Sequence, residues 1–285
     1  MARKKRYSVY AINVKLQSNE RSGNQAYEDI FSELWTRRIA IKIDEDHAIY
    51  LRTQFVTNID NTIVIYGIMT RFISFQQGDW FNVPEGETVD YNSPENLGAK
   101  PKDTNYYFIP AAHRFIFLPD NGFSTSMVTK FLEQALKKVI KQTEQIDVIV
   151  QQSQSTFEEI FNAYKLEELK VHLSYSNNDG FSIDLERQMD DEIRNAQITD
   201  LTVSAKSEVE ENILLTEMPM INTALKLAQS GQGTAEAKIK YENGKTRRIK
   251  TSEHPEKIEL DEETDENNLT LKIVRKIMSI FRRND

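Results

Sequence analysis

The pair His113-Arg114 has side chains that could carry out acid/base chemistry. It stands in the run Ala-Ala-His-Arg-Phe-Ile-Phe. An imidazole can exchange a proton near neutral pH and a guanidinium can stabilise an oxyanion, so the pair would suit metal-independent cleavage of RNA. In a strand, however, neighbouring side chains point to opposite faces, and alternation groups His113 with Phe115 and Phe117. The alternative is a hydrogen-bonded histidine beside the core and a surface arginine.

A basic stretch near the end of the sequence could bind phosphate groups. Residues 236–250 carry two acids and six cations. The cations are Lys238, Lys240, Lys245, Arg247, Arg248 and Lys250. Asn243-Gly244 favours a type I′ turn, so we expect a hairpin with a cationic face beside Tyr241. Release of counterions would then drive binding to nucleic acid. The alternative is a solvated sheet edge that lysines protect from aggregation.

The other candidate groups favour plain turns. Asp44-Glu45-Asp46-His47 could ligate a divalent metal, but it lies between two apolar strands and we expect a solvated turn. The sequence has no cysteine, which excludes thiolate metal sites, thiol nucleophiles and disulfides. The four histidines are scattered, and no Gly-x-Ser-x-Gly elbow or phosphate loop occurs. We therefore expect no metal site and no cofactor.

The elements that would position these side chains begin with a sheet and two helices. Hydrophobic periodicity predicts strands at 7–16, 39–43, 47–56, 62–75 and 106–118, and helices at 24–38 and 124–142. Successive strands favour an antiparallel meander, and residues 76–105 are expected to form a long loop. The expected fold class is α+β, with antiparallel sheets, helices packed on one face and a ferredoxin-like elaboration.

The second half of the chain starts near Ser153, and we predict two domains. Residues 1–152 would form an N-terminal α+β domain, and residues 153–285 a C-terminal α+β domain with the basic hairpin and a terminal amphipathic helix. That helix could dock within the fold, across a homodimer or on a membrane surface, and the first two are favoured. Pro219 predicts a break in a helix over 212–229, and a turn is expected at 176–180.

Composition limits the function classes. A net charge of −8 argues against a uniformly basic nucleic-acid binder, although the charges stand in blocks of one sign. No 18 apolar residues run together, so we expect no membrane span and no membrane partner. The basic start of the sequence is not followed by an apolar signal core. Together with the lack of cysteine, this predicts a cytoplasmic protein.

Three segments carry a resemblance to a known family. They are the basic start into Tyr7-Ser-Val-Tyr10, the strand Tyr66-Gly-Ile-Met-Thr-Arg71 leading to Trp80-Phe81-Asn82, and the strand and turn from Leu169 to Asp179. These segments resemble an uncharacterised bacterial family, a domain of unknown function whose members occur among phage-defence genes. The resemblance implies a role in bacterial defence and gives no activity to any residue.

The leading hypothesis is a defence-associated protein that binds nucleic acid without catalysis and forms a homodimer or binds a protein partner. The first alternative is a metal-independent nuclease that uses His113 and Arg114. Because alternation separates these two, that nuclease would need another cation, such as Arg71, on the face of the histidine. The second alternative is a protein–protein module that senses or neutralises a partner.

Overall fold

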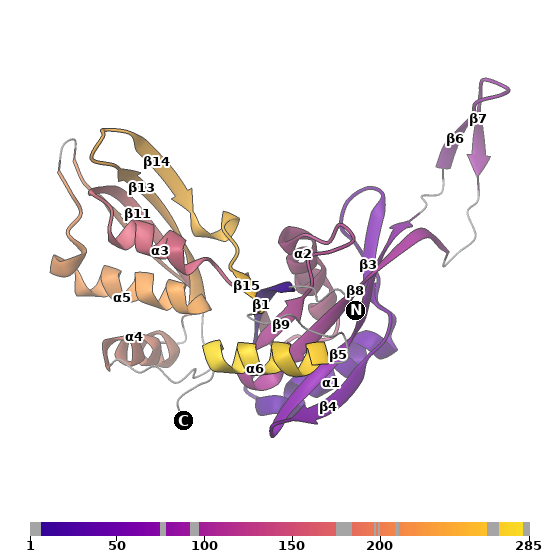
Figure 1. Cartoon of the computed structure of the whole chain (residues 1–285), viewed down its shortest axis with the longest axis horizontal. Helices are drawn as coiled ribbons and strands as arrows, with labels where there is room; N and C mark the ends of the chain where they lie inside the picture. Colours follow the sequence, from indigo (N-terminus) through magenta and orange to yellow (C-terminus); the bar gives the residue numbers. More distant parts are fainter. Residues whose placement is uncertain are drawn as a thin grey trace, which may run out of the picture.

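The computed structural model describes residues 7–74, 78–91, 97–174, 184–196, 198, 200–208, 211–260 and 268–281. Figure 1 shows two sheets, each with its own helices, lying side by side along the longest axis, and a β-hairpin that extends from one end. All strand pairs described are antiparallel, which confirms the predicted α+β class. The turn expected at residues 176–180 lies outside the described residues.

The larger sheet contains nine strands of the described chain. They are β1 (Ser8–Gln17), β2 (Ile41–Lys42), β3 (His47–Leu51), β4 (Phe55–Ile59), β5 (Thr62–Ser74), β8 (Gly98–Ile109), β9 (Arg114–Phe117), β10 (Gln145–Val150) and β15 (Lys257–Glu259). Their order is β10-β1-β9-β8-β5-β3-β2, with β15 beside β1 and β4 beside β5. The ferredoxin-like detail is not confirmed. A split βαβ unit needs parallel neighbours, whereas β1 is antiparallel to both β9 and β10.

Two helices cover one face of this sheet, as predicted. In α1 (Gly23–Thr36) and α2 (Thr125–Leu136), apolar residues recur every three or four positions, and these stripes are buried against the sheet in one cluster. The ring of Phe31 in α1 stacks on Phe108 in β8 with centroids 4.3 Å apart. The Ser124 hydroxyl caps α2 by accepting a backbone hydrogen bond.

The C-terminal helix α6 (Leu269–Phe281) packs on the opposite face of the larger sheet. Its buried residues Ile273 and Ile277 share an apolar cluster with Val9 of β1 and Ile116 of β9. Figure 1 shows the helix lying across these strands. The terminal helix therefore docks within the fold, which was one of the two favoured alternatives.

The segment 106–118, predicted as one strand, forms a tight hairpin. Strand β8 ends before the 3-10 turn Pro110–Ala112 (η1), and β9 follows antiparallel to β8. Pro110 begins the turn, where its fixed φ is suitable and its missing N–H is not needed. His113 completes the reversal with a φ of 52°. The prediction of one continuous strand is wrong because Pro110 starts a chain reversal at this point.

Two other predicted elements also differ from the structure. The strand 47–56 is divided into β3 and β4, and Asp60-Asn61 joins β4 to β5 with φ values of 49° and 62°, as in a type I′ turn. The loop expected at 76–105 contains β6 (Gly78–Asn82) and β7 (Glu87–Tyr91), which pair only with each other, and the start of β8.

The smaller sheet contains four strands of the described chain, in the order β12-β11-β13-β14. The strands are β11 (Lys165–Ser174), β12 (Asp200–Lys206), β13 (Gly233–Lys240) and β14 (Thr246–Lys250). The helices beside them are α3 (Gln154–Phe161), α4 (Asp184–Asn195) and α5 (Pro219–Leu227), with the short turns η2 (Leu215–Glu217), η3 (Ala228–Gln232) and η4 (Thr251–Glu253). Helix α5 begins at Pro219, which confirms the expected break. The three helices bury apolar side chains against one face of the sheet.

The last part of the chain returns to the larger sheet. After β14, strand β15 pairs with β1, and α6 then covers the second face of the larger sheet. The division into residues 1–152 and 153–285 stays a prediction. A protein cut after residue 152 would lose β15 and α6, and the apolar cluster beneath α6 would be exposed to water.

Candidate nucleic-acid interface

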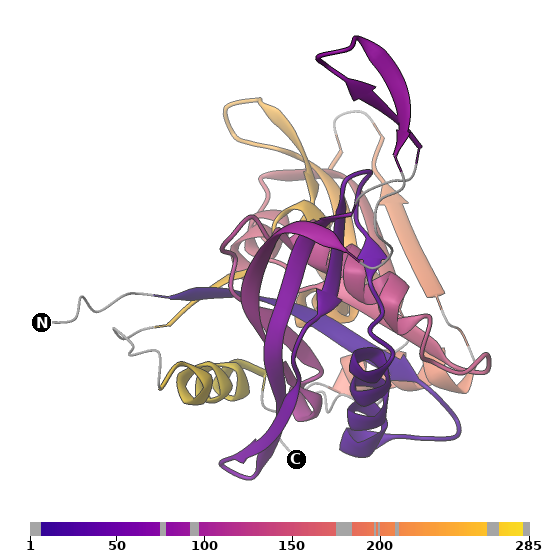
Figure 2. The same cartoon turned by 90° about the vertical axis from the view of Figure 1, so that its right-hand side faces the viewer.

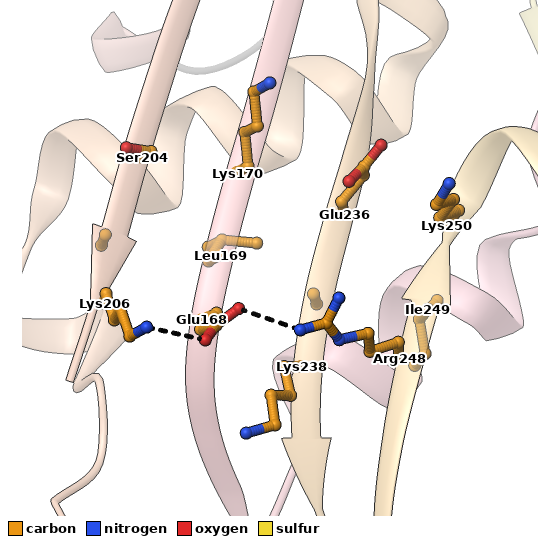
Figure 3. Close-up of a pocket in the computed structure, with 12 residues that line it drawn as sticks. Glu168, Leu169, Lys170, Ser204, Lys206, Glu236, Lys238, Arg248, Ile249 and Lys250 are labelled. Atoms are coloured by element: carbon orange, nitrogen blue, oxygen red, sulfur yellow. Dashed lines mark ion pairs between the residues drawn. The ribbon is translucent and has the colours of Figure 1, made fainter. Parts of the chain in front are cut away.

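The smaller sheet has one face packed on helices and one face open to solvent. Side chains alternate along each strand, so Leu169 and Val171 point toward the helices whereas Lys170 points outward. The outward side chains surround a shallow hollow of about 300 Å³ (Figure 3). The open surface is called the basic face below, and it comprises Lys170, Lys206, Lys238, Lys240, Arg248 and Lys250 together with the acids Glu167, Glu168 and Glu236.

One row across the sheet places Glu168 between cations. The strand register sets Glu168 opposite both Lys206 and Lys238, and Lys238 opposite Arg248. The Lys206 ammonium lies 3.2 Å from the Glu168 carboxylate and the Arg248 guanidinium 4.0 Å from it, as the dashed lines in Figure 3 mark. The hydrogen bond from Lys206 is the main cause of the lowered pKa of Glu168. This carboxylate is therefore ionised and holds two of the cations in place.

A second row of residues, two positions further along the strands, has the same alternation of acid and cations. Glu236 lies opposite Lys170 on one side and opposite Lys250 on the other. The Lys250 ammonium is 4.0 Å from Glu253. Both rows thus put an acid between cations, and the cations outnumber the acids on this face.

Two cations of the basic face remain accessible although they have acidic neighbours. The side chains of Arg248 and Lys206 are 78% and 75% exposed, whereas that of Lys238 is 33% exposed and lies 2.8 Å from Glu167. Exposed ion pairs contribute little free energy because water competes for both charges. A phosphate group can therefore replace a carboxylate as the partner of these cations at a small cost in free energy.

The structure brings together four of the six cations predicted for the hairpin. Lys238, Arg248 and Lys250 line the hollow, and Lys240 occupies the next outward position on β13. Lys245 lies at the exposed turn between the strands, outside the hollow. The sixth cation, Arg247, lies on the other face.

Arg247 points toward α3 because Ile249, two residues later, is part of the core. The Nη1 atom of Arg247 donates to Glu159 Oε1 at 2.9 Å. Tyr241 also donates from its hydroxyl to Glu159, so the expected position of Tyr241 beside the cationic face is wrong. The neighbours Arg247 and Arg248 therefore lie on opposite faces of one strand, with different partners.

The hairpin is confirmed but its turn type differs from the prediction. A type I′ turn needs positive φ at both central residues. Among the described turn residues only Gly244 has it, with a φ of 80°. The Gly244 N–H donates to the Tyr241 carbonyl at 2.9 Å, and Tyr241 N–H donates to the Lys245 carbonyl at 2.9 Å. The loop is thus a longer turn that ends in one left-handed glycine.

His113 and Arg114 lie on opposite faces of the larger sheet, as predicted, although His113 belongs to the turn before β9 and not to the strand. The His113 ring is nearly buried beside Tyr27 of α1, with centroids 5.1 Å apart. Arg114 is buried on the face of α6, where Nη1 donates to Asn13 Oδ1 at 2.6 Å and the guanidinium lies 4.4 Å from the centre of the Phe281 ring. The expectation of a surface arginine is therefore wrong.

The other cation considered for a nuclease is also distant from the histidine. Arg71 in β5 lies opposite Lys102 of β8, whereas His113 follows the far end of β8. At about 3.3 Å per residue, the intervening length of β8 is on the order of 20 Å. Arg71 and His113 therefore do not share a site.

Two members of the basic face were missed in the sequence. Lys170 and Lys206 come from β11 and β12, which lie beside the hairpin in space but end more than 25 residues before it begins. Apolar residues alternate with polar or charged ones along most of each strand, which is the signal of a sheet with one open face. The sequence does not show that the open positions of these strands adjoin those of the hairpin.

The turn at Asp44 is closed by its own hydrogen bonds. Asp44 Oδ1 accepts from the backbone N–H groups of Asp46 and His47, and the His47 ring Nδ1 lies 3.0 Å from the same oxygen. In the part of the chain that the structure describes, no group of three metal-binding side chains is found. None of the helices in that part has the length and apolar character needed to cross a bilayer.

The fold and the basic face define an α+β protein with two antiparallel sheets and an open, cationic sheet surface. A family model described as "Domain of unknown function (DUF4747)" matches residues 5–279, so the chain belongs to this family. The resemblance to an uncharacterised domain family is thereby confirmed. No curated protein shows significant similarity to the sequence.

Proposed function

We propose that this protein binds nucleic acid through the phosphate groups on its basic face and does not catalyse a reaction. The observation that carries the proposal is the gathering of six cations from four strands on one open sheet surface, where they outnumber the acids Glu167, Glu168 and Glu236. Neutralisation of phosphates by such cations releases condensed counterions, which provides affinity independent of sequence.

The character of the hollow favours contacts to the backbone over contacts to bases. None of the described side chains that line it is aromatic, so it offers no ring on which a base could stack. Lysine and arginine contacts to phosphates fix position without reading sequence. We therefore expect weak discrimination between sequences and strong dependence on salt.

The context of this activity is part of the same proposal. We extend the proposal to a role in bacterial defence, which the resemblance noted in the sequence implies, and to a cytoplasmic location, which the cysteine-free composition favours. A protein that neutralises phosphates without reading sequence would bind nucleic acid of any sequence.

Fluorescence anisotropy with labelled single- and double-stranded RNA and DNA, at several salt concentrations, tests the proposal. Arg248→Gln should weaken binding to every ligand and reduce the slope of log affinity against log salt by about one. Arg247→Gln is the matched control, because it removes the same charge from the opposite face of the same strand. Equal losses in the two variants, or no binding by the natural protein, would contradict the proposal.

A further inference from the structure

The hairpin formed by β6 and β7 has no partner strand outside itself. It is called the acidic arm below and comprises residues 78–91. In the described chain its two strands form a separate two-stranded sheet. Figures 1 and 2 both show it extending beyond the larger sheet. A two-stranded hairpin by itself is at best marginally stable in water, so the acidic arm has the character of a segment that binds a partner.

The charge of the acidic arm indicates a cationic partner. Residues 78–91 contain four acids and no lysine or arginine. Glu85 and Glu87, near the tip, are exposed and lie two residues apart. Positive charge from another surface would offset the repulsion between these like charges.

The acidic arm also exposes apolar surface. Val83 is 77% exposed and Val89 is 38% exposed. A partner that supplied only charge would leave this surface in water, whereas the stems of lysine and arginine side chains can cover it while their charged ends reach the acids.

We infer that the partner is a second copy of this chain, and that the acidic arm of each copy lies on the basic face of the other. The basic face is an open sheet surface with an excess of cations, and every copy carries both surfaces. Within one chain the two surfaces lie at opposite ends of the longest axis in Figure 1, so an arm meets a basic face only between copies. Such exchange gives two equivalent contacts related by a twofold axis.

The arrangement has a consequence for ligand binding. The acidic arm and a nucleic acid would occupy the same cations, so each would compete with the other for the basic face. The dimer itself does not depend on the proposed nucleic-acid function, because complementary charge between the two copies suffices for it.

Sedimentation or light scattering on the full chain tests the inference at low and at high salt. At low salt we expect a dimer, and at about 1 M salt a shift toward monomer, because screening shortens the range of these contacts to about 3 Å. The variant Glu85→Lys with Glu87→Lys, and the variant Lys238→Glu with Arg248→Glu, should each weaken the dimer at least about tenfold. All four substitutions in one chain should restore it, because the complementary charges are then exchanged.

Two further variants keep the test decisive. Arg247→Gln, on the helix side of β14, should leave the dimer intact. Replacement of residues 78–91 by a short Gly-Ser linker should abolish the dimer while circular dichroism shows that the sheets remain folded. A monomer at low salt, or a dimer unchanged in both charge-reversal variants, would overturn the inference. The linker variant should still bind nucleic acid, so failure of the dimer and failure of the proposed function can be told apart.

Discussion

The side-chain amide of Asn13 donates a hydrogen bond of 2.7 Å to the carbonyl oxygen of Gly231, which lies 218 positions further along the chain. Asn13 belongs to β1 of the larger sheet, and Gly231 to η3, just before β13 of the smaller sheet. Asn13 also accepts a hydrogen bond from Arg114, and all three residues are buried. A buried polar chain thus connects the two sheets.

Replacement of Gly231 should destabilise the protein because of this junction. Gly231 has a φ of 94°, and an added Cβ would lie 3.1 Å from Gln151 Oε1 and 3.2 Å from Arg114 Nη2. Gly231→Ala should cost about 2–3 kcal/mol of unfolding free energy, from backbone strain and close contacts together. Urea denaturation measures the loss. Gly244 also has a positive φ but an open surrounding, so Gly244→Ala should cost only about 1 kcal/mol.

Removal of the Asn13 side chain should destabilise the protein, because the buried guanidinium of Arg114 loses a hydrogen-bond acceptor. Asn13 Oδ1 accepts from Arg114 at 2.6 Å, and both side chains are buried between the sheets. Asn13→Ala should lower the unfolding free energy by roughly 3 kcal/mol, because a guanidinium would lose a charge-assisted hydrogen bond away from water. The double variant with Arg114→Leu should be more stable than Asn13→Ala alone. A double variant less stable than the single one would contradict this account.

Neutralising Glu168 should strengthen nucleic-acid binding. Its carboxylate holds Lys206 at 3.2 Å and Arg248 at 4.0 Å, and it would repel an incoming phosphate. We expect Glu168→Gln to raise affinity by roughly two- to tenfold, which corresponds to up to about 1.4 kcal/mol. Anisotropy titrations provide the measurement. Glu159→Gln removes the same charge on the helix side, beside Arg247, and should leave affinity unchanged.

No nuclease activity is expected from His113 and Arg114. The His113 ring is nearly buried beside Tyr27, and Arg114 is buried on the opposite face with Asn13 and Phe281. The natural protein and His113→Ala should both leave single-stranded RNA and DNA intact, with and without divalent metal. Cleavage by the natural protein that disappears in a folded His113→Ala variant would establish the nuclease alternative.

The ion pair of Arg21 with Glu144 should make stability fall in acid. Two guanidinium nitrogens of Arg21 donate to the two carboxylate oxygens of Glu144, each at 2.7 Å, and the Lys141 N–H donates at 2.8 Å. These bonds, led by that of Arg21, lower the pKa of Glu144 to about 2. A carboxylate with a depressed pKa stabilises the fold above its unfolded pKa, about 4.3, and loses that contribution as the pH falls toward 2.

Glu144→Gln tests this pair directly. The variant should be less stable than the natural protein by roughly 3 kcal/mol at neutral pH, and the difference should shrink between about pH 4.3 and pH 2. Urea denaturation at a series of pH values measures it. A difference in unfolding free energy that does not change between these two pH values would show that ionisation of Glu144 does not account for the stability contributed by this ion pair.

The sequence by itself predicted the elements whose signals are local. Periodicity located α1 and α2 and placed both on one face of an antiparallel sheet. Gly244 marked the hairpin of β13 and β14, although a single left-handed residue replaces the type I′ turn. Pro219 marked the start of α5. In each case the residues that determine the local structure lie within one element or one turn.

Only the tertiary structure decided which open surfaces adjoin and which polar side chains are buried. Lys170 and Lys206 join Lys238 because the sheet order sets β11 and β12 beside β13, and strand order depends on contacts far apart in the sequence. Arg114 is buried because α6 and η3 pack over its face of β9. Hydrophobic periodicity shows which side of a strand is apolar. It does not show which element packs on the other side.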